Sequence, residues 1–161
     1  NSLSGYSGKV YTDTLYWDID VEGDLDKARQ QTLQLCLKLA GMGYEPGLEI
    51  YFSGSKGFHV LLRSKNQFNP QETARICYNV AREADCLSGF DTVVYNTNRI
   101  FRVANTLHPK SRLYKIPLEP SELEEKSAAD IQLLAKVSRE IPSVAQPVDV
   151  SELIEKFGKV A

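Results

Sequence analysis

Both histidines of the chain lie in short motifs whose residue types suit phosphate chemistry. His59 ends a glycine-containing stretch, Ser53–His59, and His108 begins the sequence His108-Pro109-Lys110. The pair Asp18-x-Asp20 precedes both motifs. Carboxylates can hold divalent metal ions, and cationic groups flanked by glycine can hold phosphates. Nucleotidyl transfer needs both.

The two aspartates lie on the same side of an expected strand, with Cα atoms about 6–7 Å apart. Such a pair suits joint coordination of Mg²⁺ or Mn²⁺, which prefer oxygen ligands. Two exposed aspartates on a strand edge are the ordinary alternative. The apolar neighbours Trp17 and Ile19 indicate a central strand, where unpaired acids are unusual without a purpose.

The later motifs have ordinary alternatives as well. The Ser53–His59 turn offers backbone N–H groups, a hydroxyl, an ammonium and an imidazole to an anion, but it could be a hairpin turn with an exposed His59. Arg99 and Arg102 through Lys110 could hold phosphates or form a solvated basic hairpin. Asp91 is a third candidate acid; it could instead cap a turn, and Asp85 is its rival.

Composition describes an ordinary water-soluble domain. The 161 residues are 42% hydrophobic and 25% charged, with a net charge of −2. The charge is unevenly spread, because windows 50–71 and 92–118 contain no acidic residue and each encloses a histidine motif. These windows indicate a surface that faces a polyanion, although a solvated face is the ordinary reading of a charge run.

Other classes of protein are disfavoured. No apolar run approaches the ~20 residues of a membrane span, and no signal-peptide pattern is visible, so we expect a cytoplasmic protein, or a nuclear one in a eukaryote. The three cysteines lack metal-binding or disulfide spacing; Cys36 and Cys77 fit a core. Because the chain begins at Asn1, we expect a piece of a longer protein.

Periodicity and capping signals predict the elements. Alternating apolar residues predict strands at 12–20, 48–53 and 58–63, and further strands are expected near 99–103 and 113–118. Helices are expected after Asp24, after Asn69-Pro70, and from the capping box Ser121-x-x-Glu124 to about Arg139. We therefore expect a domain over residues 1–140. Residues 141–161 are read as a linker and a short helix at Ser151–Phe157, leading to domains outside this chain.

The order of these elements predicts an α+β fold of the RRM-like, split βαβ type, β-α-β-β-α-β, with a C-terminal β-hairpin and helix. In this topology the first and third strands pair antiparallel, the fourth strand lies on the other side of the first, and helices cover one face. The open face then carries Asp18, Asp20 and His59. We expect these three residues and the segment after Asp91 to converge on one corner.

Taken together, the motifs resemble the archaeo-eukaryotic primase superfamily, which includes the primase small subunit and the primase-polymerases. The family pattern is a strand-borne Asp-x-Asp, a later Ser-Gly-x-x-Gly-x-His, and a hydrophobic-Asp motif followed by an Arg-rich hairpin near His-Pro-Lys. The match covers about Tyr16 to Leu118, in the correct order. Two features depart from the family: one basic residue, in Ser55-Lys56, where many members have two, and no Cys/His zinc module.

The resemblance implies roles for individual residues. It implies that two catalytic Mg²⁺ or Mn²⁺ ions are bound by three acids, Asp18, Asp20 and Asp91. It further implies that the triphosphate of a nucleotide is held by Ser53, Ser55, Lys56, His59, Arg102 and His108. The residues that follow His108 in the acid-free window 92–118 are basic, which predicts contacts with the template from Lys110, Arg112 and Lys115.

These inferences favour a template-directed nucleotidyltransferase, a primase or primase-polymerase core. It would use nucleoside triphosphates, a single-stranded DNA template and a primer, with helicase-like or other replication domains in the full-length protein. The alternative is a non-catalytic single-stranded nucleic-acid-binding module, with Tyr16 and Tyr51 stacking on bases. Asp18 and Asp20 on the same face would repel phosphates unless metal intervened, which favours the enzyme.

Overall fold

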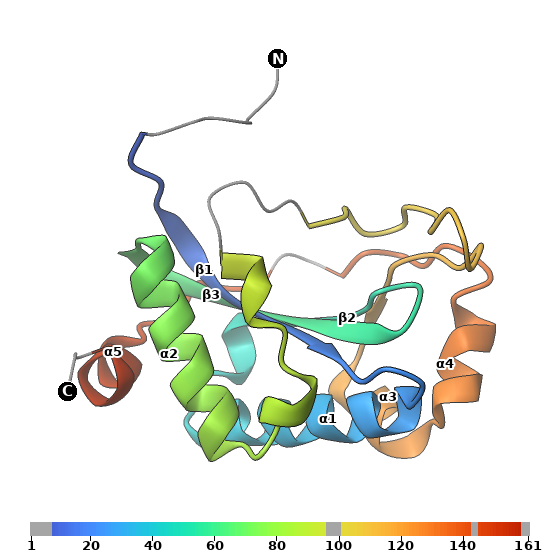
Figure 1. Ribbon diagram of the computed structural model, residues 1–161, viewed down its shortest axis with the longest axis horizontal. Helices are drawn as coiled ribbons and strands as arrows, with labels where there is room; N and C mark the ends of the chain where they lie inside the picture. Colours follow the sequence, from blue (N-terminus) through green and yellow to red (C-terminus); the bar gives the residue numbers. More distant parts are fainter. Residues whose placement is uncertain (1–7, 96–100, 143–144, 159–161) are drawn as a thin grey trace.

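An antiparallel sheet of four strands forms the centre of the computed structural model, which describes residues 8–95, 101–142 and 145–158 (Figure 1). The strands are β1 (Thr12–Asp20), β2 (Leu48–Phe52), β3 (Gly57–Phe68) and β4 (Ile116–Leu118), in the spatial order β1-β3-β2-β4. The longer helices are α1 (Leu25–Gly41) and α2 (Pro70–Glu83). The shorter elements are η1 (Glu45–Gly47), η2 (Leu87–Gly89), η3 (Thr92–Tyr95), α3 (Pro120–Glu125), α4 (Ala128–Leu134) and α5 (Ser151–Phe157).

The two long helices begin where the sequence predicts. The Asp24 side chain accepts a hydrogen bond from the backbone N–H of Lys27 at 2.9 Å and begins α1. Asn69 and Glu72 form a reciprocal capping box at the start of α2, with Pro70 in the first turn. Both signals are local, because each cap satisfies backbone donors within its own first turn.

The sheet separates two faces with different chemistry. Side chains that alternate along β1 and β3, such as Trp17 and Val60, are buried beneath α1 and α2. Trp17 also donates its indole N–H to the carbonyl of Cys77 on α2 at 2.9 Å. Asp18 lies directly opposite His59 in the β1–β3 register, on the other face. In Figure 1 the segment after residue 100 runs over this second face, opposite the helices.

The fourth strand corrects the predicted topology. The fourth strand of the observed sheet is Ile116–Leu118, which pairs with Ile50–Phe52 of β2, whereas the strand expected beside β1 was the one near 99–103. Residues 101–103 of the strand expected near 99–103 have no regular structure, and residues 99 and 100 lie outside the described residues. The free side of β1 is met instead by Phe90, which forms a single bridge with Ile19. The α+β class and the antiparallel sheet are confirmed.

The helices of the C-terminal third differ from those predicted from the sequence. One helix was expected from Ser121 to about Arg139, but two short ones form, because Ser127 caps a second start through Asp130. The cap of α3 is Glu119, not Ser121. Of the predicted C-terminal β-hairpin, a single bridge between Leu107 and Tyr114 is present, and the two strands expected for it do not pair.

The last described residues pack on the rest of the fold. Val148 lies beside β3, accepting from the N–H of Lys65 at 2.9 Å, and α5 forms at its predicted position with Leu153 and Phe157 buried near α2. All three cysteines are buried and free, as expected for Cys36 and Cys77. Within residues 8–95, 101–142 and 145–158, no helix has the length and apolar character needed to cross a bilayer.

Candidate active site

A cavity of about 350 Å³ lies on the open face where β1 ends and β3 begins. We call it the site cavity. Its wall contains all nine residues predicted to bind metal or nucleotide, and two more, Gly57 and Phe101; the full set is Asp18, Asp20, Ser53, Ser55, Lys56, Gly57, His59, Asp91, Phe101, Arg102 and His108. The predicted template residues Lys110, Arg112 and Lys115 do not line it. The structure thus brings together residues from five separate stretches of the sequence, at 18–20, 53–59, 91, 101–102 and 108.

The acidic side of the site cavity is set by strand pairing. Asp18 Oδ1 lies 3.7 Å from His59 Nε2 across the β1–β3 ladder. Asp91 reaches the same corner because its N–H donates to the carbonyl of Asp18 at 3.0 Å. Gly57 is required for this closeness, because a Cβ there would collide with the carbonyl oxygen of Ile19 and touch Asp20.

The Ser53–His59 turn is braced by its own hydroxyl. Ser53 Oγ accepts from the N–H groups of Ser55 and Gly57, both at 3.3 Å. Gly54 has φ +84°, which favours glycine, and a Cβ there would press on the backbone of Leu113 and Tyr114. The turn is therefore fixed against the hairpin that carries His108.

Two cationic side chains, one within the turn and one outside it, lie at the site cavity. Lys56 is exposed (67% of its side chain) and its Nζ lies 2.7 Å from Asp20 Oδ2. Arg102 donates from Nη2 to the carbonyl of Ser53, and burial lowers the pKa of its guanidinium. His108 lies beyond Arg102, and its Nδ1 accepts from the N–H of Ser111 at 3.2 Å.

Three residues in the wall of the site cavity each have a buried polar atom without a hydrogen-bond partner: Asp20 Oδ1, His59 Nδ1 and Arg102 Nη1. In the part of the chain that the structure describes, the only other such side-chain atom is Gln31 Oε1. A buried polar atom left unsatisfied costs about 1–3 kcal/mol, and native proteins keep few of them. Their concentration here indicates a site prepared for a polar ligand.

His59 is held neutral in the free protein. Its side chain is 9% exposed, and burial, followed by the positive charges of Lys115 and Arg102, lowers its pKa from 6.5 to about 3. A neutral imidazole offers one N–H donor and one acceptor. An anion placed in the site cavity would offset the two positive charges and favour a protonated His59.

Phe101 lines the site cavity, although the sequence motifs predicted no role for it. Its ring meets His59 edge-on at 5.1 Å and Tyr16 edge-on at 4.9 Å between centroids. Phe101 therefore covers the imidazole from the open side. The available signal was an aromatic residue beside Arg102 in a basic motif, and it is a weak one.

The three predicted template residues are placed differently from one another. Lys110 and Arg112 are exposed on the hairpin tip, where Arg112 has a φ of 59°. Lys115 is 4% exposed, and burial together with Arg102 lowers its pKa to about 8. It does not project from the hairpin as the other two do.

The acid set has the chemistry of a divalent-cation site. Asp18, Asp20 and Asp91 line one cavity, supply only oxygen ligands, and include the unpartnered Asp20 Oδ1. Among the described residues, no three His, Cys, Asp or Glu side chains converge closely enough to enclose an ion. The Lys56 ammonium contacts Asp20 instead, and its exposure allows it to move away.

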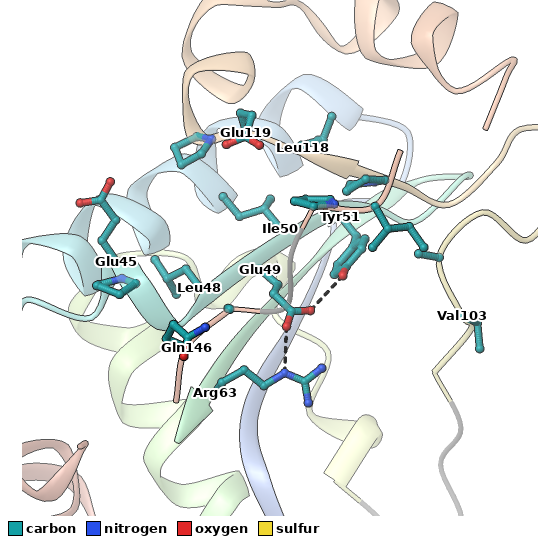
Figure 2. Close-up of a pocket in the computed structure, with 17 residues that line it drawn as sticks. Glu45, Leu48, Glu49, Ile50, Tyr51, Arg63, Val103, Leu118, Glu119 and Gln146 are labelled. Atoms are coloured by element: carbon teal, nitrogen blue, oxygen red, sulfur yellow. Dashed lines mark hydrogen bonds and ion pairs between the residues drawn. The ribbon is translucent and has the colours of Figure 1, made fainter. Parts of the chain in front are cut away.

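A second cavity, of about 530 Å³, lies along β2 and β4 (Figure 2). Three of its acids are Glu45, Glu49 and Glu119, and its basic side chain Arg63 is bound to Glu49 at 2.8 Å. Glu49 also accepts from the Tyr51 hydroxyl at 2.9 Å, as Figure 2 shows. This cavity has three acids and one basic side chain, which is already bound to Glu49, so it does not suit phosphates.

Comparison with known proteins gives a likeness of fold. No family model and no curated protein matches the chain. Among solved structures, the fold is similar to the polymerase domain of Mycobacterium tuberculosis Ligase D in complex with DNA, with a TM-score of 0.59 and 16% identity. The match covers 83% of this chain and 55% of that one, so this chain spans about half of the matched protein. At this identity, what the two proteins share is the fold.

Proposed function

We propose that the protein is a metal-dependent, template-directed nucleotidyltransferase, the catalytic core of a primase or primase-polymerase. The observation that carries the proposal is the site cavity, whose wall brings together three acids, two cationic side chains and two imidazoles, and includes residues with buried polar atoms that lack partners. The ordered motifs of the primase superfamily and the likeness in fold to a polymerase domain support it.

The acidic half of the site cavity would hold the metal. Asp18, Asp20 and Asp91 would bind two Mg²⁺ or Mn²⁺ ions, which when bound activate the 3′-hydroxyl and neutralise charge at the α-phosphate. Lys56 would leave Asp20 when the nucleotide arrives, because the triphosphate offers its ammonium a stronger anionic partner.

The other half would hold the phosphates. Arg102 and His59 each have a buried nitrogen without a hydrogen-bond partner, so a small movement of either side chain would let that nitrogen engage phosphate oxygens. The 3′-oxygen would bond to the α-phosphorus while the bond to pyrophosphate breaks. The cationic groups would then stabilise the charge that builds on the leaving pyrophosphate.

The binding-module alternative fits the open face less well. Tyr16 stacks on Tyr95 with ring centroids 4.9 Å apart and is met edge-on by Phe101, so other rings of the chain already contact it. Tyr51 has the ammonium of Lys115 4.8 Å from its ring centre. Both aromatic residues on which that alternative depends are therefore engaged within the protein.

Incorporation of labelled nucleotide on primed single-stranded DNA tests the proposal. We expect incorporation with Mg²⁺ or Mn²⁺ and none with chelator. Asp18→Ala should reduce it at least about a hundredfold while the protein stays folded, because the change removes charge stabilisation at the reacting phosphate. Glu45→Gln, an exposed acid of the second cavity, is the matched control. Wild-type activity in Asp18→Ala at saturating Mg²⁺ would refute the metal assignment, and an inactive wild-type protein would favour the binding module.

A further inference from the structure

Lys115 is a buried cation next to the site cavity but not in its wall. Its ammonium donates to the carbonyl of Arg102 at 2.8 Å and lies 4.8 Å from the centre of the Tyr51 ring. Its backbone is paired on both sides, with its N–H bound to Thr106 and its carbonyl to Asn105. Residues 102–106 thus fold around the Lys115 side chain.

These contacts hold Arg102 at two points. Lys115 binds its backbone carbonyl, and the carbonyl of Ser53 accepts from its guanidinium. The second terminal nitrogen of its guanidinium, Nη1, is the buried atom without a hydrogen-bond partner. Arg102 lies in a stretch with no regular secondary structure, so no ladder of backbone hydrogen bonds fixes its position. Without Lys115, its backbone would lose a charged anchor.

We propose that Lys115 is a positioning residue of the phosphate site: its buried ammonium anchors the backbone of Arg102 and so aims the guanidinium into the site cavity. This assignment replaces the template contact predicted from the sequence. It rests on the proposed function, because it takes a nucleoside triphosphate as the ligand of Arg102.

The surroundings of Lys115 explain how the fold tolerates a buried ammonium there. The Tyr51 ring faces it, and the Tyr51 hydroxyl is fixed by Glu49, which in turn binds Arg63. The carboxylates of Asp18 and Glu49 favour its charged form, whereas burial and Arg102 oppose it. A DNA strand could not contact this ammonium without displacing the segment that covers it.

Two binding measurements on the same variants separate positioning from template contact. Affinity for a nucleoside triphosphate with Mn²⁺ reports on the phosphate site, and the salt dependence of single-stranded DNA binding reports on phosphate contacts with the template. For Lys115→Met we expect nucleotide affinity to fall roughly tenfold, the scale of a lost charged hydrogen bond, with an unchanged DNA salt slope. For Lys110→Ala/Arg112→Ala we expect the reverse, with a slope smaller by about 1.4. Lys65→Met, an exposed lysine on β3, is the control and should change neither.

Further variants guard against loss of folding and test the route of the effect. Lys115→Gln keeps a donor for the Arg102 carbonyl and should lose less affinity than Lys115→Met. In an Arg102→Ala background, Lys115→Met should have no additional effect, because the group that it positions is gone. A purely structural role would instead lower the melting temperature and weaken both ligands in either background.

Each outcome decides between the ideas. An unchanged nucleotide affinity in Lys115→Met, or a reduced DNA slope, would overturn the positioning role while leaving the proposed function standing. A wild-type protein that binds no nucleotide would overturn the proposed function, and the positioning role with it.

Discussion

The two cavities of this protein lie on the same side of one sheet and have no lining residue in common, and their chemistry is opposite. The second cavity is larger, about 530 Å³ against about 350 Å³. Its one basic side chain, Arg63, is paired with Glu49, and Glu49 also accepts from Tyr51. The site cavity instead keeps buried atoms of Asp20, His59 and Arg102 without partners.

The difference shows that volume is a poor guide to function in this fold. Polar groups that already hydrogen-bond to one another within the protein have less capacity left for a ligand. A smaller cavity with unsatisfied buried atoms carries a cost of about 1–3 kcal/mol for each, which a ligand with matching groups can relieve. Unsatisfied atoms therefore mark the place where a polar ligand gains most from binding.

The largest effect is expected when one arginine in each cavity is replaced by alanine in separate variants. Arg102→Ala should weaken binding of a nucleoside triphosphate by roughly 10- to 100-fold, because it removes a charged hydrogen-bond donor from a desolvated site. Arg63→Ala, the matched change in the second cavity, should alter affinity by less than about twofold. Titration calorimetry with Mn²⁺ and nucleotide measures both. Equal effects of the two variants would break the contrast between the cavities.

A pH test of stability addresses the unsatisfied imidazole. His59 has a pKa of about 3 in the fold against 6.5 in the unfolded chain, so below pH 6.5 the unfolded state binds a proton that the folded state does not. The free energy of unfolding therefore loses nothing to His59 above pH 6.5. Below that pH, proton uptake by the unfolded state lowers it by up to about 1.4 kcal/mol per pH unit as the pH drops toward 3.

His59→Gln is the variant that isolates this effect. It should flatten the fall between pH 6.5 and 5, as followed by urea unfolding. His108 remains in both proteins, and its own contribution cancels in the comparison. Parallel pH profiles for wild type and variant would show that His59 is solvated rather than buried.

The smallest expected effect concerns the ion pair between Lys56 and Asp20. Lys56→Ala removes an exposed ion pair, worth about 0.2–1 kcal/mol, so Mn²⁺ affinity without nucleotide should rise up to about fivefold. Nucleotide affinity should fall in the same variant, since the ammonium no longer reaches the phosphates. Mn²⁺ titration followed by electron paramagnetic resonance measures the first effect. Lower Mn²⁺ affinity in Lys56→Ala would show that the lysine does not compete with metal.

Most of the fold was predictable because its signals are local. Alternation along β1 and β3 identified the buried face, and the caps at Asp24 and Asn69 located the helix starts. The position of β4 was not predictable in this way, because its three residues pair with β2, which lies some 65 residues away in sequence. The end of α3 was missed because the competing cap at Ser127 was not recognised.

The site was predictable where strand register determines it. Once β1 and β3 are paired, Asp18 must face His59, and the turn at Ser53 must lie beside Asp20. The burial of Lys115 could not be read from the sequence, because it depends on how residues 101–106 cover the open face. Charge alone cannot distinguish a lysine that binds a partner from one that anchors its own chain. The roles of the individual residues stay predictions until the assays above are done.

The pairing of Asp18 with His59 also has a consequence for how the protein opens. A slip of one residue between β1 and β3 would turn both acids toward the helices and expose Trp17, so this wall of the site cavity cannot loosen without losing the core. Amide hydrogens along β1 and β3 should exchange with solvent only on global unfolding, whereas those of residues 101–106 should exchange through local opening. Ligand entry and release would then depend on local opening of residues 101–106, while the wall formed by β1 and β3 stays closed.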